Sequence, residues 1–144
     1  AAGPESVRAA VERLHAERIG HGVAALQDPA VVELLANRAV PLEICPTSNR
    51  ITGAALPVGH AFLEFDRAGC IVTIDADDPA MFHTSIETEY GLVEALAGSD
   101  CLERYVRNAI DGSFAEPQLK RAMRARLATE IDAARRSEAG HVGP

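Results

Sequence analysis

Three short runs rich in apolar and β-branched residues recur along the chain, each separated from the next by a stretch with helical character. The runs are RIGHG (18–22), VPLEICP (40–46) and CIVTID (70–75). The third is apolar without alternation, which is typical of a parallel strand covered on both faces. Strands that alternate with helices over short connections indicate an α/β fold with right-handed crossovers. The pattern therefore predicts either an open doubly wound sheet or part of a (β/α)8 barrel.

The segments around these runs carry helix signals. A first helix is predicted to begin at Pro4, with Val7, Val11 and Leu14 at helical spacing. A second helix is predicted to follow Asp28, whose side chain can cap its first turn. The remaining predicted helices cover 58–68, 85–98, 100–111 and 117 to about 136. Between them, the residues TSNRITG (47–53) predict a polar loop.

The last predicted helix has apolar residues four positions apart, which predict its buried face. These residues are Leu119, Met123, Leu127 and Ile131. We expect one structural unit over residues 1–138 and a flexible tail over 139–144.

Charge and composition narrow the class of partner. The chain of 144 residues has a net charge of −7, and its arginines are scattered, whereas nucleic-acid binding needs clustered basic residues. No run of about eighteen apolar residues and no basic leader occurs, so we expect no membrane span and a cytoplasmic protein. Three cysteines without a CxxC pair predict reduced thiols, with Cys45 and Cys70 inert in the core.

Polar residues follow each of the three predicted strands. His21 ends the first strand, 47–49 (Thr-Ser-Asn) follow the second, and Asp77 and Asp78 follow the third. In parallel α/β folds of both kinds, ligands bind at the carboxyl ends of the strands. These residues therefore predict a functional site at that edge of the sheet.

Each of these residues also has a plain structural interpretation. Asp77 and Asp78 precede Pro79 and can cap a turn; alternatively, adjacent carboxylates are held ionised by a divalent metal, with one of them as a ligand. His21 lies between two glycines, which lets a substrate or a metal approach closely, although a strand histidine is often structural. We expect the other histidines, His15, His60, His83 and His141, to be solvated or capping. GxGxxG, Walker and GxSxG sequences do not occur.

Several segments together resemble the adenosine deaminase family in order and spacing. They are ERIGHG (17–22), PLEICPTSN (41–49), GHAFLEFDRAG (59–69), DDPAMF (77–82), TSIETEY (84–90) and NAIDGSF (108–114). The resemblance covers nearly the whole chain, and it implies the last three strands and terminal helices of a (β/α)8 barrel. It also implies hydrolytic, zinc-dependent deamination of adenosine or 2′-deoxyadenosine to the inosine product and ammonia. Adenine and 6-amino-6-deoxyfutalosine are alternative substrates, and a non-catalytic module that binds a purine or a partner protein is a further alternative.

The resemblance also implies a role for each site residue. Asp77 matches the zinc ligand, and Asp78 matches the residue that accepts a hydrogen bond from the purine imidazole nitrogen. His21 matches the histidine that stabilises or deprotonates the water activated by zinc. Gly22, beside it, is expected to contact the substrate.

Some parts of the family pattern are absent from the chain. The family's HxH pair and its HAGE-type sequence, which carry the other zinc histidines and the glutamate that protonates the ring, do not occur. The chain starts at Ala1 without an initiator methionine, so we expect a piece of a longer protein, inactive alone, whose partner is the missing N-terminal half of the barrel. Asp75 and Ala76 stand where the family would place an Asn and a small hydroxyl residue, and the role of Asp75 stays open.

Overall fold

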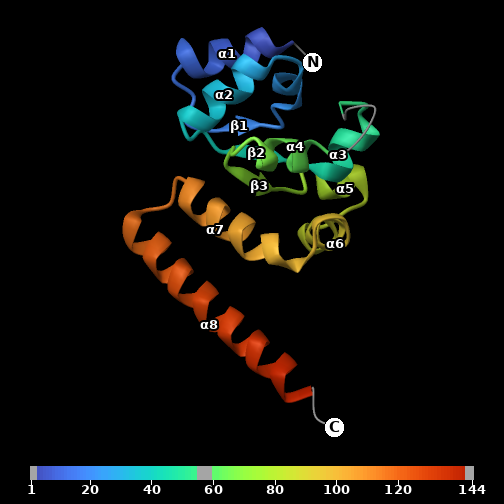
Figure 1. Cartoon of the computed structure of the whole chain (residues 1–144), viewed down its shortest axis with the longest axis vertical. Helices are drawn as coiled ribbons and strands as arrows, with labels where there is room; N and C mark the ends of the chain where they lie inside the picture. Colours follow the sequence, from blue (N-terminus) through green and yellow to red (C-terminus); the bar gives the residue numbers. More distant parts are fainter. Residues whose placement is uncertain (1–2, 55–59, 142–144) are drawn as a thin grey trace.

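A computed structural model describes residues 3–54 and 60–141, with side chains up to residue 137. Its centre is a parallel sheet of three strands in the order β1-β2-β3 (Figure 1). The strands are β1 (Ile19–Gly20), β2 (Leu42–Ile44) and β3 (Val72–Ile74), each shorter than its predicted run. Within the described residues β1 and β3 each have one unpaired edge. Consecutive parallel strands in chain order are the arrangement expected of a barrel segment.

Two helices lie on the β1 side of the sheet (Figure 1). They are α1 (Pro4–Glu12) and α2 (Pro29–Asn37), with the short 3₁₀ helix η1 (Val23–Gln27) between them. Asp28 caps α2 as predicted, because its side chain accepts a hydrogen bond from the Ala30 amide at 2.9 Å. The prediction for Leu14 was wrong: α1 ends at Glu12, and Leu14 lies beyond it with 78% of its surface exposed.

The segment after β2 is a helix rather than the predicted loop. Helix α3 (Pro46–Ile51) covers most of TSNRITG (47–53). Pro46 occupies its first turn, where a missing N–H costs nothing. Thr47, Ser48 and Asn49 are buried, and the Ser48 hydroxyl and the Asn49 side-chain oxygen have partners described below. The polar residues of 47–53 predicted a loop, whereas in the structure Ser48 and Asn49 make contacts inside the molecule.

The next elements lead to the second half of the site. Helix α4 (Ala61–Arg67) is followed by Gly69, whose φ is 79°, and His60 is its N-cap residue rather than a helical one. Residues 58 and 59 of the predicted helix lie outside the described residues. After β3 comes a single helical turn, α5 (Pro79–Phe82).

The C-terminal part is helical, as predicted. Helices α6 (Ile86–Ala97) and α7 (Leu102–Gly112), joined by η2 (Ser99–Cys101), lie on the β3 side of the sheet (Figure 1). Helix α8 (Pro117–His141) packs against α7 and then extends away from the rest of the chain. It continues beyond the predicted end near residue 136, through 139–141, and residues 142–144 lie outside the described part.

The predicted buried face of α8 is largely exposed. Leu119 is 53% and Met123 39% exposed, and only Leu127 and Ile131 are half-buried. The spacing was correct for an amphipathic helix, but in this chain α8 has little besides α7 to pack against.

The core lies between the sheet and its helices. Its largest fully buried side chains are Tyr105, Phe62, Phe65, Leu35, Leu42 and Ile44. All three cysteines are buried and free, which confirms the core positions of Cys45 and Cys70. Among the described residues, no helix combines the length and the apolar character needed to cross a membrane.

Candidate functional site

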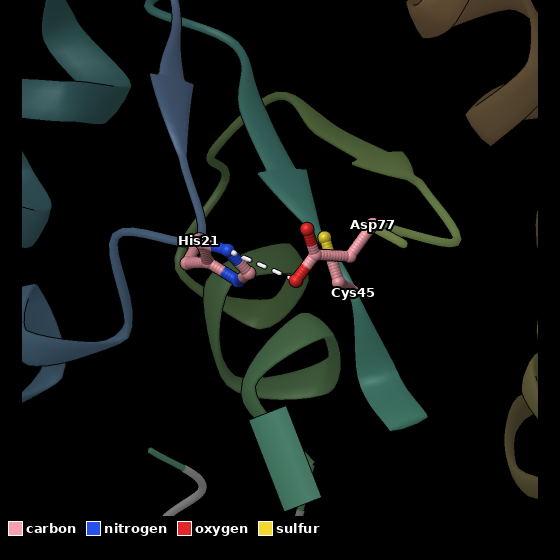
Figure 2. Close-up of side chains that lie close together, drawn as sticks. All are labelled: His21, Cys45 and Asp77. Carbon is pink, nitrogen blue, oxygen red and sulfur yellow. Dashed lines mark ion pairs between the residues drawn. The ribbon is translucent and has the colours of Figure 1, made fainter. Parts of the chain in front are cut away.

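The side chains that follow the three strands come together at one edge of the sheet, as predicted. Figure 2 shows His21 from the end of β1, Cys45 from the end of β2 and Asp77 from the segment after β3. Their potential ligand atoms all lie within 4.8 Å of one another. None of the other histidines belongs to this cluster in the described side chains: His15 and His83 are exposed, and His60 is half-buried. The side chain of His141 lies outside that description.

Both ring nitrogens of His21 face side-chain oxygens, and one of them makes a hydrogen bond. Its Nδ1 lies 2.8 Å from Oδ1 of Asn49, and its Nε2 lies 3.6 Å from Oδ2 of Asp77. Because an amide oxygen only accepts hydrogen bonds, Nδ1 carries a proton and Nε2 faces the carboxyl group. The backbone of His21 has a φ of 56°, in the left-handed region that non-glycine residues rarely adopt. Such strain is concentrated at functional sites.

Asp77 is oriented by its neighbours in the same way. Its Oδ2 accepts a hydrogen bond from the Ser48 hydroxyl at 2.6 Å, and its φ is 58°. Its backbone amide donates to Oδ1 of Asp75 at 3.1 Å. This bond gives Asp75 a partner and answers the question left open by the sequence. The side chain of Asp77 is 34% exposed, so a ligand can reach it.

Asp78 has a local structural role. Its Oδ1 accepts a hydrogen bond from the Met81 amide at 2.9 Å and thereby caps α5. Asp78 is exposed and is not part of the ligand cluster among the described residues.

Gly22 is a glycine for reasons of backbone and packing. Its φ is +64°, and a Cβ there would lie 2.8 Å from Cδ2 of Leu42 and 3.1 Å from Cγ2 of Ile19. The side-chain direction therefore points into the core, so only the backbone of Gly22 can meet a ligand. Gly22 and His21 line a hollow of about 900 Å³, together with Ser48, Asn49 and Asp77.

Cys45 is the site neighbour that sequence reasoning missed. Burial, followed by the nearby carboxyl groups of Asp75, Asp77, Glu43 and Glu89, raises the pKa of its thiol from 9.0 to about 12. Metals bind thiolates rather than thiols, and without a metal the raised pKa keeps the Cys45 thiol protonated at neutral pH. The signal available in the sequence was its position at the end of the second strand, two residues after Glu43, because alternate residues of a strand face the same side.

The donor set suits a borderline metal ion. An imidazole nitrogen and a carboxylate oxygen are ligands that zinc accepts, and a catalytic zinc takes about three protein ligands plus an open position. Asp77 supplies one ligand of that type and His21 stands directly beside it. The cluster therefore fits part of a zinc site, and further ligands must come from outside the described residues.

Comparisons with known proteins agree with this geometry. The family model for adenosine deaminase matches residues 1–130. The chain is 44% identical over 133 residues to an aminodeoxyfutalosine deaminase of Streptomyces avermitilis, covering 90% of this chain and 36% of that protein. It is 37% identical over 133 residues to an adenine deaminase of Chelativorans sp. (strain BNC1), covering 90% of this chain and 41% of that protein. It is 40% identical over 131 residues to an adenosine deaminase of Erwinia tasmaniensis, covering 89% and 40%. The chain thus spans about two fifths of the length of these relatives.

Solved structures also match this chain over about two fifths of their own length. The crystal structure of an adenine deaminase from Arthrobacter aurescens matches with a TM-score of 0.83 and 26% identity, over 91% of this chain and 41% of that one. An amidohydrolase from Burkholderia ambifaria with bound Zn matches in fold, with a TM-score of 0.81 and 22% identity, over 96% and 40%. The predicted fold class is confirmed: the chain is part of an α/β barrel, and the open doubly wound sheet is excluded.

Proposed function

Because the chain belongs to the adenosine deaminase family, we propose that it carries part of the active site of a hydrolase that removes the 6-amino group of a purine. The observation that carries this proposal is the convergence of His21 and Asp77 at the carboxyl ends of barrel strands, where Nε2 of His21 lies 3.6 Å from Oδ2 of Asp77. In barrel enzymes the active site lies at that face. The rest of the site belongs to the part of the barrel that this chain does not contain.

Each residue has a role in the proposed mechanism. Asp77 would hold zinc, which supplies, when bound, a water that is nucleophilic at neutral pH. His21 would hold or accept a proton at Nε2, because Asn49 occupies Nδ1. Asp78 would accept a hydrogen bond from the purine imidazole ring and fix its orientation. Oδ1 of Asp78 caps α5, so Oδ2 is the oxygen that we assign to this contact.

The proposed substrate is adenosine or 2′-deoxyadenosine. A second candidate is aminodeoxyfutalosine, favoured by the 44% identity to the Streptomyces avermitilis enzyme. Adenine is the third, since an adenine deaminase is 37% identical. All three share a 6-aminopurine, so the residues of this chain serve each of them in the same way. The choice depends on contacts beyond the purine ring.

An exchange experiment tests the proposal. In the exchange chimera, this chain replaces the segment of the Streptomyces avermitilis enzyme that it matches over 133 residues. We expect ammonia release from at least one of the three substrates, and its loss in the chimera with Asp77→Ala. A folded chimera that turns over none of them would contradict the proposal and favour a non-catalytic purine- or partner-binding role.

A further inference from the structure

We propose that Glu89, which no part of the mechanism above uses, is a positioning residue that holds α3 in place so that Ser48 and Asn49 meet Asp77 and His21. The anchoring of α3 by Glu89 is inferred from the contacts alone. The effect of this anchoring on turnover rests on the proposed function.

Glu89 lies in the core although it is acidic. It is 0% exposed and occupies the buried face of α6, one helical turn before Val93, which is also 0% exposed. A buried carboxyl group is costly unless it is hydrogen-bonded. A leucine would fill such a core position without that cost, so the acid at this position calls for an explanation.

The hydrogen bonds of Glu89 supply that explanation. Its Oε2 accepts from the backbone amide of Thr47 at 3.0 Å, and its Oε1 accepts from the hydroxyl of Thr84 at 2.5 Å. Thr47 is in the first turn of α3, whose amides lack partners inside the helix. Thr84 follows α5, and its amide donates to the Pro79 carbonyl at 3.2 Å. One carboxyl group therefore joins the segments that follow β2 and β3.

The segment that Glu89 anchors carries the supports of both site residues. The residue after Thr47 is Ser48, which donates to Asp77, and the next is Asn49, which bonds to His21. Helix α3 is only six residues long and packs mainly against α5. If the Thr47 bond were lost, α3 would shift and move Ser48 and Asn49 together. A misplacement of about 1 Å at such a site can cost about 100-fold in rate.

Four variants separate positioning from simple stability. Glu89→Met keeps the length and removes both acceptors. Glu89→Gln keeps an acceptor for Thr47 and can donate to the Thr84 hydroxyl, so it serves as the rescue. Val93→Ala is the matched control, because it removes core packing from the same helix without touching α3 hydrogen bonds. Thr84→Val removes one of the two bonds and serves where Glu89→Met does not fold.

The first readout is independent of turnover. In the 144-residue chain without metal, the ring nitrogens of His21 are observed by ¹⁵N NMR at about pH 8, where an ordinary histidine is neutral. Asn49→Ala gives the reference spectrum for a lost bond. We expect Glu89→Met, and in part Thr84→Val, to move the His21 signals toward that reference, while Glu89→Gln and Val93→Ala retain the wild-type signals.

The second readout is turnover in the exchange chimera. We expect Glu89→Met to lower kcat by about 10–100-fold, as for other residues that orient metal ligands, with a change in KM below about threefold. Glu89→Gln should recover most of that loss. The proposal would be overturned if Glu89→Met, or Thr84→Val where Glu89→Met does not fold, kept the wild-type His21 signals. It would also be overturned if Val93→Ala changed the His21 signals or kcat as much as Glu89→Met does. If the wild-type chimera shows no turnover, the proposed function fails, and the His21 spectra still decide the role of Glu89.

Discussion

Gly22→Ala is expected to destabilise the chain through two separate effects. The φ of +64° is unfavourable for any residue with a Cβ, at about 1–2 kcal/mol. The added methyl group would also lie 2.8 Å from Leu42 and 3.1 Å from Ile19, and overpacking of this kind costs about 1–3 kcal/mol. Together these predict a loss of about 2–5 kcal/mol, a large share of the roughly 5–15 kcal/mol available to a typical domain.

Gly69→Ala is the matched control for the backbone effect alone. Gly69 has a φ of +79°, but nothing lies within 4 Å of its Cβ position. Urea unfolding followed by circular dichroism should therefore show a loss for Gly22→Ala that exceeds the loss for Gly69→Ala by at least about 1 kcal/mol. Equal losses would refute the argument that Gly22 is required by packing. If the two stability losses are equal but Gly22→Ala raises KM in the exchange chimera, the result would instead favour the contact between Gly22 and the substrate that the sequence predicts.

Three further predictions concern the residues around the site. In the exchange chimera, Asp77→Ala should abolish zinc-dependent turnover, whereas Asp78→Asn should weaken turnover with zinc retained; equal zinc loss by elemental analysis would contradict these separate roles. Ser48→Ala removes the donor to Asp77 and should weaken zinc binding about 10–100-fold by calorimetry, and an unchanged affinity would exclude an orienting role. The pKa of Cys45 is raised from 9.0 to about 12 in the fold, so above about pH 9 the unfolded chain loses its thiol proton first. The free energy of unfolding should therefore fall with rising pH, as measured by urea midpoints at about pH 8 and 10.5. Cys45→Ala should reduce that fall, and an unchanged pH dependence would argue against the shift.

Much of the fold could be predicted because its strands are marked by local composition. The centres of the three strands lie inside the apolar runs, but the ladders are shorter than those runs. Strand length depends on which backbone groups find partners, which a single sequence does not specify. Helix α3 was missed for a related reason: the burial of Ser48 and Asn49 depends on Asp77 and His21, which lie far away in the sequence.

The candidate site was predictable only in part. His21 and Asp77 follow from the rule that polar residues at the carboxyl ends of parallel strands converge. Glu89 could not be found in this way, because it lies in an ordinary amphipathic helix and its contact with Thr47 spans 42 positions. Cys45 had the composition of a core residue and is one, yet it also borders the site. Local patterns thus identify the residues that face a ligand more readily than those that support them from behind.

The three carboxyl groups at the end of β3 are tolerated because each has a different hydrogen-bond donor. Asp75 accepts from the backbone amide of Asp77, and Asp78 accepts from that of Met81. Both bonds stabilise the local turn, so neither side chain needs a metal to remain in place. Asp77 differs, because its donor is a side chain from another element, Ser48 of α3, and its Oδ2 also lies 3.6 Å from Nε2 of His21. Asp77 is therefore the carboxyl group of the three whose contacts belong to the ligand cluster, whereas Asp75 and one oxygen of Asp78 shape the backbone around it. Removal of Asp77 should accordingly affect metal binding most.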